Sequence, residues 1–136
     1  MTIFRFSLMA LVVTTGVASL GAARAGDGVA LPSGRMASLL EAIWEPQTKP
    51  METWLRLRFV VPGIGPELDF AEVGADLLAL CQTQALPELA RTGKSADQAI
   101  ISISSEPLLF GAINPDVTQY FEAYRLRGGD CILEGF

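Results

Sequence analysis

The stretch Thr53-Trp-Leu-Arg-Leu-Arg-Phe-Val-Val61 decides the fold of this 136-residue chain. Its residues alternate in character with a period of two, which predicts a β-strand with one buried face. The face expected in the core carries Leu55, Leu57, Phe59 and Val61. The opposite, partly solvated face carries Trp54, Arg56, Arg58 and Val60. The prolines and glycines of residues 62–66 then end the strand, because proline lacks the N–H that a ladder needs.

A helix is predicted after this strand, over residues 69–85. Asp69 is suited to cap it, and Glu72 three residues later resembles a capping box. The stripe at helical spacing comprises Phe70, Val73, Leu77, Leu80, Cys81 and Gln84. Pro87 interrupts the pattern, and a short further turn is expected to end near Gly93. This helix therefore has one apolar face that can pack on a sheet.

Further strands are predicted on both sides of the helix. Residues 36–44 fit a helix or a strand, and residues 46–50 have the composition of a turn. Residues 99–104 alternate isoleucines with serines, which predicts a half-buried strand whose serine face is wet. The arms 120–127 and 130–133 are joined by a Gly-Gly pair, which indicates a hairpin. The expected fold is α+β, a mainly antiparallel sheet with one main helix packed on one face.

Residues 1–25 have the features of a signal peptide. Arg5 provides the positive charge, an apolar run follows, and Ala23-Arg24-Ala25 is the small-x-small pattern that a signal peptidase recognises. We expect cleavage after this triplet, leaving residues 26–136 as a single small α+β domain that is periplasmic or secreted. The apolar run is shorter than the roughly 20 residues of a membrane span. No stable membrane anchor is therefore expected after cleavage, and an uncleaved anchor is the alternative.

The expected mature domain is acidic. Loss of Arg5 and Arg24 leaves eight basic residues against 15 acidic ones, which changes the formal charge from −5 to −7. This charge argues against nucleic acid or anionic lipid as a partner, because both require clustered lysine and arginine. The partner is expected to be a protein or a small molecule of unknown identity. The sequence indicates no cofactor and no metal.

The two cysteines, Cys81 and Cys131, are expected to form a disulfide. Two cysteines in an exported chain most often pair, and their spacing matches no metal motif. The chain has no histidine, so an ordinary zinc site would lack its commonest nitrogen ligand. A bond between these cysteines would tie the terminal hairpin to the helix. Two free buried thiols are the alternative.

Catalytic chemistry has few candidates in this chain. The absence of histidine excludes Ser-His-Asp and Cys-His arrangements. Three acidic residues share one face of the predicted helix, Asp69, Glu72 and Asp76. They allow the hypothesis of a small hydrolase that uses paired carboxylates. The simpler explanation is that negative charge is favoured in the first turns of a helix. No catalytic residue is assigned.

Trp54, Arg56 and Arg58 form the candidate ligand surface. An aromatic ring flanked by guanidinium groups can hold a carboxylate or the face of a sugar. The structural alternative is that both arginines pair with acidic residues on a neighbouring strand, such as Glu122. The first function hypothesis is thus a non-catalytic, exported binding or envelope-associated domain, and the alternative is the carboxylate hydrolase.

The run 54–62, the helix cysteine Cys81, the segment 118–124 and the tail 131–136 resemble a family of small exported alphaproteobacterial proteins. That family is classed as a domain of unknown function, and the resemblance covers the whole expected mature length. It implies export and a cysteine pair, and it brings no activity and no site residues. Some members carry an acetolactate synthase label, which this sequence does not support because the thiamine-diphosphate motif is missing.

Overall fold

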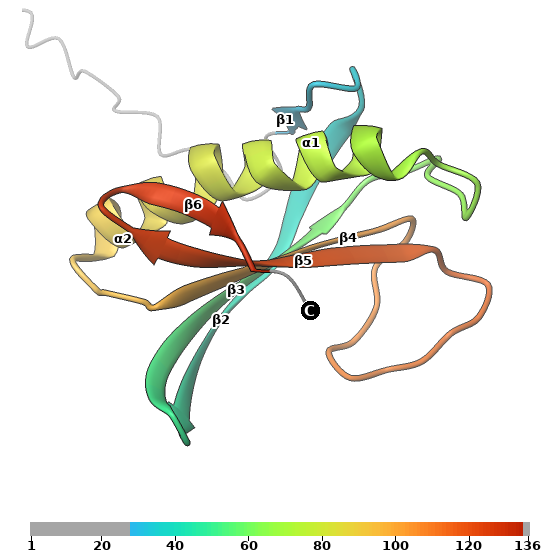
Figure 1. The fold of residues 1–136 in the computed structure, drawn as a ribbon. Coiled ribbons are helices and arrows are strands. Elements are labelled where there is room, and N and C mark those ends of the chain that lie inside the picture. Colours follow the sequence, from blue (N-terminus) through green and yellow to red (C-terminus); the bar gives the residue numbers. More distant parts are fainter. Residues whose placement is uncertain (1–27, 135–136) are drawn as a thin grey trace, which may run out of the picture.

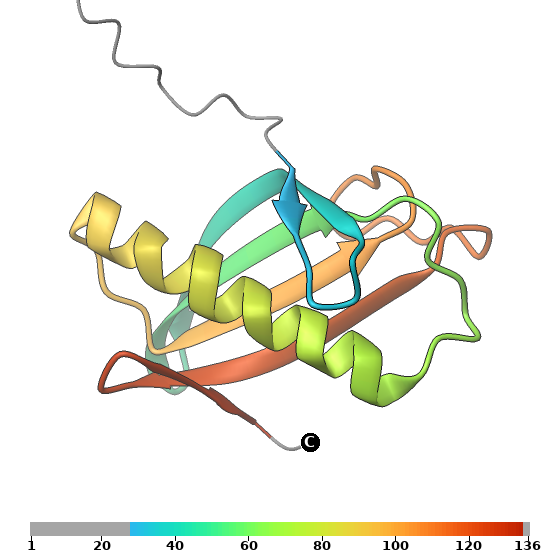
Figure 2. The same ribbon diagram turned by 90° about the horizontal axis from the view of Figure 1, so that it is seen from above.

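The computed structural model describes residues 28–134, so the predicted signal peptide lies outside the described residues. These residues form a six-stranded sheet in the order β1-β2-β3-β4-β5-β6, with a helical segment across one face (Figures 1 and 2). The strands are β1 (Val29–Ala30), β2 (Met36–Thr48), β3 (Met51–Val60), β4 (Gln98–Ser104), β5 (Gln119–Arg127) and β6 (Asp130–Leu133). Every neighbouring pair is antiparallel except β3 and β4. The predicted α+β class, with a mainly antiparallel sheet, is therefore confirmed.

The parallel pair arises because the helical segment connects β3 to β4 and returns the chain to the edge from which β3 began. This segment consists of α1 (Phe70–Leu80), a π-helical turn η1 (Cys81–Ala85) and α2 (Leu86–Thr92). Asp69 caps it as predicted, since its carboxylate accepts a hydrogen bond from the Ala71 N–H. Helical structure continues through Pro87, which lies in the first turn of α2, and ends at Gly93 in the left-handed conformation.

The core lies between this helical segment and the sheet. All four residues predicted for the inner face of β3 are buried, and so are most members of the predicted helix stripe. The main contributors from the two layers are Leu55, Leu57, Phe59, Val61, Val73, Leu77, Leu80, Cys81, Ile101, Ile103 and Tyr124. Phe70 is the clearest exception in the stripe, because it is 78% exposed at the start of the helix, where its ring meets Tyr120 edge-on. Gln84 is only half-buried.

The predicted disulfide is present between Cys81 and Cys131. Their Cα atoms are 6.3 Å apart, and the bond joins the turn η1 to the edge strand β6. The terminal hairpin of β5 and β6 also forms as predicted, with Leu126 opposite Cys131. The C-terminal strand is thereby fixed against the helical layer.

Two predictions about the second strand are resolved or corrected. The ambiguous residues 36–44 are strand, and the turn predicted at 46–50 is confined to residues 49–50, because β2 runs through Pro46 to Thr48. β1 covers β2 only opposite Met36 and Ala37, so the rest of β2 is a sheet edge. An edge strand tolerates proline, because its missing N–H need not break a ladder.

The half-buried strand predicted at 99–104 is instead buried on both faces. Ser102 and Ser104, expected on a wet face, are only 4% and 3% exposed. β4 lies in the middle of the sheet, and residues 105–118, here called the β4–β5 loop, lie on the side of the sheet opposite the helix (Figure 1). Ser104 anchors this loop by donating its hydroxyl to the Glu106 carbonyl at 2.8 Å. The loop thus shields the serine face from solvent.

Candidate functional site

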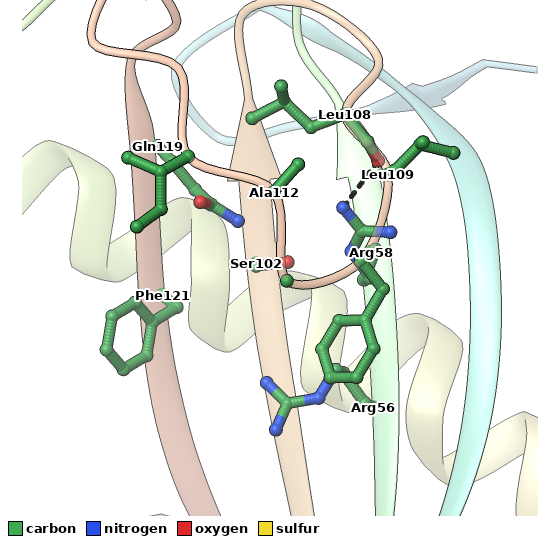
Figure 3. A pocket seen from close by; sticks show the side chains of 11 residues that line it. Arg56, Arg58, Ser102, Leu108, Leu109, Ala112, Gln119 and Phe121 are labelled. Atoms are coloured by element: carbon green, nitrogen blue, oxygen red, sulfur yellow. Dashed lines mark hydrogen bonds between the residues drawn. The ribbon is translucent and has the colours of Figure 1, made fainter.

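A cavity of about 310 Å³ lies between the β4–β5 loop and the face of the sheet that is turned away from the helix (Figure 3). This volume falls at the lower end of the range for small-molecule sites. The sheet contributes Arg56, Arg58, Ser102, Gln119 and Phe121. The loop contributes Leu108, Leu109, Phe110, Gly111, Ala112 and Ile113. Polar groups therefore come from the sheet and apolar groups mainly from the loop.

Strand register assembles the polar side. Arg58 on β3 lies opposite Glu41 on β2 and Ser102 on β4, and Ser102 in turn lies opposite Phe121 on β5. Residues opposite each other in a sheet project from the same face. One row across four strands thus carries an acid, an arginine, a hydroxyl and an aromatic ring on the same face, and the last three line the cavity.

Arg58 joins the sheet to the loop. Its side chain is only 6% exposed, and its Nη1 donates to Glu41 Oε2 at 2.8 Å. Its Nη2 donates to the Leu108 carbonyl at 2.7 Å, the contact drawn as a dashed line in Figure 3. The guanidinium carbon also lies 5.6 Å from the ring centre of Phe110. Arg58 is therefore largely engaged within the protein.

Arg56 is held differently. Its Nε donates to Glu45 Oε2 at 3.1 Å, and its guanidinium carbon lies 5.0 Å from the ring centre of Phe110. Its two terminal nitrogens donate no hydrogen bond to any residue between 28 and 134. In Figure 3 the guanidinium extends from β3 across β4, toward the side where Phe121 lies. Two cationic donors thus remain open to the cavity.

Ser102 provides a further open donor. Within the described part of the chain its hydroxyl has no hydrogen-bond partner, although the residue is only 4% exposed. Ser104, two residues along the same face, donates its hydroxyl to the loop backbone. Because Ser102 lines the cavity and its oxygen is not sealed from solvent, this hydroxyl can donate to a ligand or a water.

The structure separates Trp54 from the other two residues of the predicted ligand surface. Arg56 and Arg58 line the cavity, whereas Trp54 does not. The Trp54 indole donates to Glu52 Oε2 at 3.1 Å, in a separate cluster where Arg125 donates to Glu52 Oε1 at 2.7 Å. The Arg125 guanidinium holds the pKa of Glu52 below its ordinary value, and the Trp54 hydrogen bond acts in the same direction.

The acids that pair with Arg56 and Arg58 also differ from Glu122, the example that the sequence suggested. Glu122 lines a small pocket with Tyr124 and Cys131, on the helix side of β5. The acids that pair with the two arginines are Glu41 and Glu45, both on β2. Pairing with a neighbouring strand is thus confirmed, and the proposed partner is wrong because it projects to the opposite face.

The predicted carboxylate cluster has a structural role at the N-terminal end of α1. Asp76 is 2% exposed and accepts hydrogen bonds from the Ser33 N–H at 3.0 Å and the Ser33 hydroxyl at 2.6 Å. Glu72 forms an ion pair with Arg35 rather than closing a capping box, and Asp69 caps the helix. These contacts tie the turn between β1 and β2 to the helix. Among residues 28–134 no group of three or more His, Cys, Asp or Glu side chains is arranged to hold a metal ion.

Sequence reasoning missed the contribution of the loop to the site. Residues 108–110 lie outside any helix or strand and form part of the cavity wall. A usable signal is present, since no charged residue occurs between Glu106 and Asp116 while the run is apolar. Leu109 and Ile113 are 83% and 95% exposed. Exposed apolar residues gathered in one loop often mark a binding surface.

The fold and the cavity define a small α+β domain whose sheet carries a helix on one face and an arginine-lined cavity on the other. Residues 11–136 match the family described as "Family of unknown function (DUF6497)", and the chain belongs to this family. The predicted resemblance to a domain of unknown function is thereby confirmed. No curated protein and no solved structure matches the chain. Between residues 28 and 134, no helix is long and apolar enough to cross a membrane.

Proposed function

We propose that this protein is an exported, non-catalytic domain that binds a small molecule in the cavity beneath the β4–β5 loop. The observation that carries the proposal is the convergence of open donors there. The Ser102 hydroxyl and the terminal nitrogens of Arg56 face a space of about 310 Å³ and donate to no described residue. A few polar groups converging in a largely apolar cavity are typical of ligand sites.

The chemistry of the lining favours binding over catalysis. Its polar side chains are Arg56, Arg58, Ser102 and Gln119. None of these is a general base at neutral pH, and the chain has no histidine to activate the serine. The carboxylates considered for a hydrolase are occupied in caps and ion pairs at the far face of the sheet. The lining therefore supports binding rather than hydrolysis.

Export is supported by two independent features. The pattern of residues 1–25 is that of a signal peptide, and disulfides such as Cys81–Cys131 persist in oxidising compartments. Expression of the full chain, followed by fractionation and intact-mass measurement, tests this part. The periplasmic or secreted fraction should contain a chain that begins at Gly26. Recovery of the uncleaved chain from the cytoplasm or the membrane would contradict export.

Binding is tested by a fragment screen on the protein purified from cells that express the full chain. Amide chemical shifts in two-dimensional NMR spectra should move around Arg56, Ser102 and Phe110 when a fragment binds. Ser102→Leu should reduce these shifts by filling the cavity from its floor. Gln98→Leu is the matched control, because Gln98 lies on the same face of β4 outside the cavity lining. A screen whose hits all map elsewhere, or that yields none, would overturn the proposed function.

A further inference from the structure

We infer that the ligand is a monocarboxylate bearing an apolar or aromatic group, bound with its carboxylate on Arg56 and Ser102 and its apolar part against Phe110. This inference rests on the proposed function, whose cavity it uses. It adds the chemical class of the ligand and the role of each side chain.

The open donors have the geometry that a carboxylate needs. The guanidinium of Arg56 is fixed by its Nε contact to Glu45 and by the ring of Phe110, so its two terminal nitrogens are held in place. A planar pair of N–H donors matches the two oxygens of a carboxylate. Ser102, on the neighbouring strand β4, supplies a hydroxyl that lines the cavity and can donate a third hydrogen bond.

The charge balance of the cavity favours a ligand with one negative charge over a ligand with two. Glu41 and Glu45 each pair with one of the cavity arginines, so the four side chains carry no net formal charge. Arg58 also directs its donors to Glu41 and the Leu108 carbonyl. The cavity therefore offers hydrogen-bond donors without a net positive charge to balance a doubly charged phosphate. A carboxylate suits this balance.

The loop supplies the surface for an apolar group. Phe110 is 54% exposed, and Leu109 and Ile113 are more exposed still. Burying such side chains under an apolar ligand group is favourable, at about 25 cal/mol per Å² of apolar surface removed from water. A ligand with a carboxylate at one end and an apolar group at the other satisfies both walls of the cavity.

A matched ligand series tests the class. The protein purified from cells expressing the full chain is titrated with 3-phenylpropionate, 3-phenylpropionamide, propionate and phenyl phosphate, with NMR shifts as readout. The acid should bind about tenfold more tightly than its amide, the size of one charge-assisted hydrogen bond. Propionate should bind more weakly than the acid because it lacks the ring. Equal binding of acid and amide, or tightest binding of phenyl phosphate, would overturn the inference.

Variants locate the carboxylate. Arg56→Gln should lower affinity for the acid about tenfold and leave amide affinity unchanged. The double variant Arg56→Gln with Glu45→Gln keeps the local charge balanced and should lose the same affinity for the acid. An equal loss shows that the effect of Arg56→Gln does not come from leaving Glu45 unpaired. Arg125→Gln is the matched control, since Arg125 is paired with acids outside the cavity lining. An equal loss in the control, or none in either Arg56 variant, would contradict the assignment.

The carboxylate can belong to a free acid or to the C-terminus of a peptide. A tripeptide ending in phenylalanine, with a free or an amidated C-terminus, distinguishes these sources. A free-ended peptide that binds more tightly than 3-phenylpropionate identifies a peptide end, and the reverse identifies a small acid. Fragments that map to the cavity without carboxylate preference would sink the ligand class while leaving the proposed function standing.

Discussion

Replacing Cys131 by alanine removes the covalent tie between η1 and β6, and its effect follows from the size of the loop. The disulfide joins positions separated by 50 residues. In the chain-entropy model a loop of this size lowers the entropy of the unfolded chain by about 14 cal/mol/K, or about 4 kcal/mol at 25 °C. Small domains are stable by about 5–15 kcal/mol in total. The loss is therefore a large fraction of the free energy of unfolding.

The two cysteines differ in burial, which separates the covalent effect from a packing effect. Cys81 is fully buried in the core, whereas Cys131 is half-buried. Cys81→Ala should therefore cost about 1 kcal/mol more than Cys131→Ala, because it also leaves a small cavity. The double variant should cost little more than Cys81→Ala alone, since the bond can be lost only once.

Urea unfolding followed by the fluorescence of the two tryptophans measures these differences. Wild-type protein kept reduced should unfold at the same urea concentration as Cys131→Ala, which controls for the substitution itself. Intact-mass measurement under non-reducing conditions should give a chain two hydrogens lighter than the reduced form. A loss below about 1 kcal/mol in Cys131→Ala would refute the entropic reasoning. Two thiols that react freely in the native oxidised protein would refute the pairing.

Three further predictions concern single side chains and are all measured by urea unfolding. Ser104→Ala should cost about 1 kcal/mol because it removes the hydroxyl bond to the loop, whereas Ser102→Ala should be nearly neutral; equal costs would contradict the open hydroxyl. Asp76→Ala should cost about 3 kcal/mol by removing the buried acceptor of both Ser33 donors in the β1–β2 turn, and a cost under about 1 kcal/mol would show that the turn is not fixed by it. The Arg125 guanidinium lowers the pKa of Glu52 in the folded protein. The Glu52 carboxylate therefore stabilises the fold at pH values above its ordinary pKa of 4.5, and this stabilisation is lost as the pH falls through the lowered pKa. Glu52→Gln should therefore flatten the decline of stability between about pH 5 and 3, and an unchanged decline would contradict the linkage.

Local periodicity sufficed for the central elements of the fold. The strand at 53–61 and the helix after Asp69 have one strong period each, and the structure places both where the pattern predicts them. Residues 36–44 were ambiguous because their apolar positions fit both periods. Their long antiparallel pairing with β3, a contact between separate segments, decides for strand. Burial of both faces of β4 was likewise unpredictable, because the second cover comes from a loop.

The partners of the two arginines depend on a bulge that no local pattern reveals. Leu39 lies opposite Phe59, but Glu41 lies opposite Arg58, so the register shifts by one residue between them. Without that shift, Glu41 would lie opposite Leu57 and project toward the helix. Because side chains alternate between faces, one extra residue moves the following acids onto the cavity face. The charge balance of the cavity thus depends on one inserted position in an edge strand.

Arg56 and Arg58 illustrate how equivalent sequence positions acquire different roles. They lie two residues apart on the same strand and face, and each pairs with an acid of β2 beside the ring of Phe110. Arg58 also lies beneath the start of the loop, so its second donor reaches the Leu108 carbonyl and holds the cavity wall. Arg56 lies beyond that carbonyl and keeps its terminal nitrogens open. One arginine therefore supports the wall of the site, and the other is left to meet the ligand.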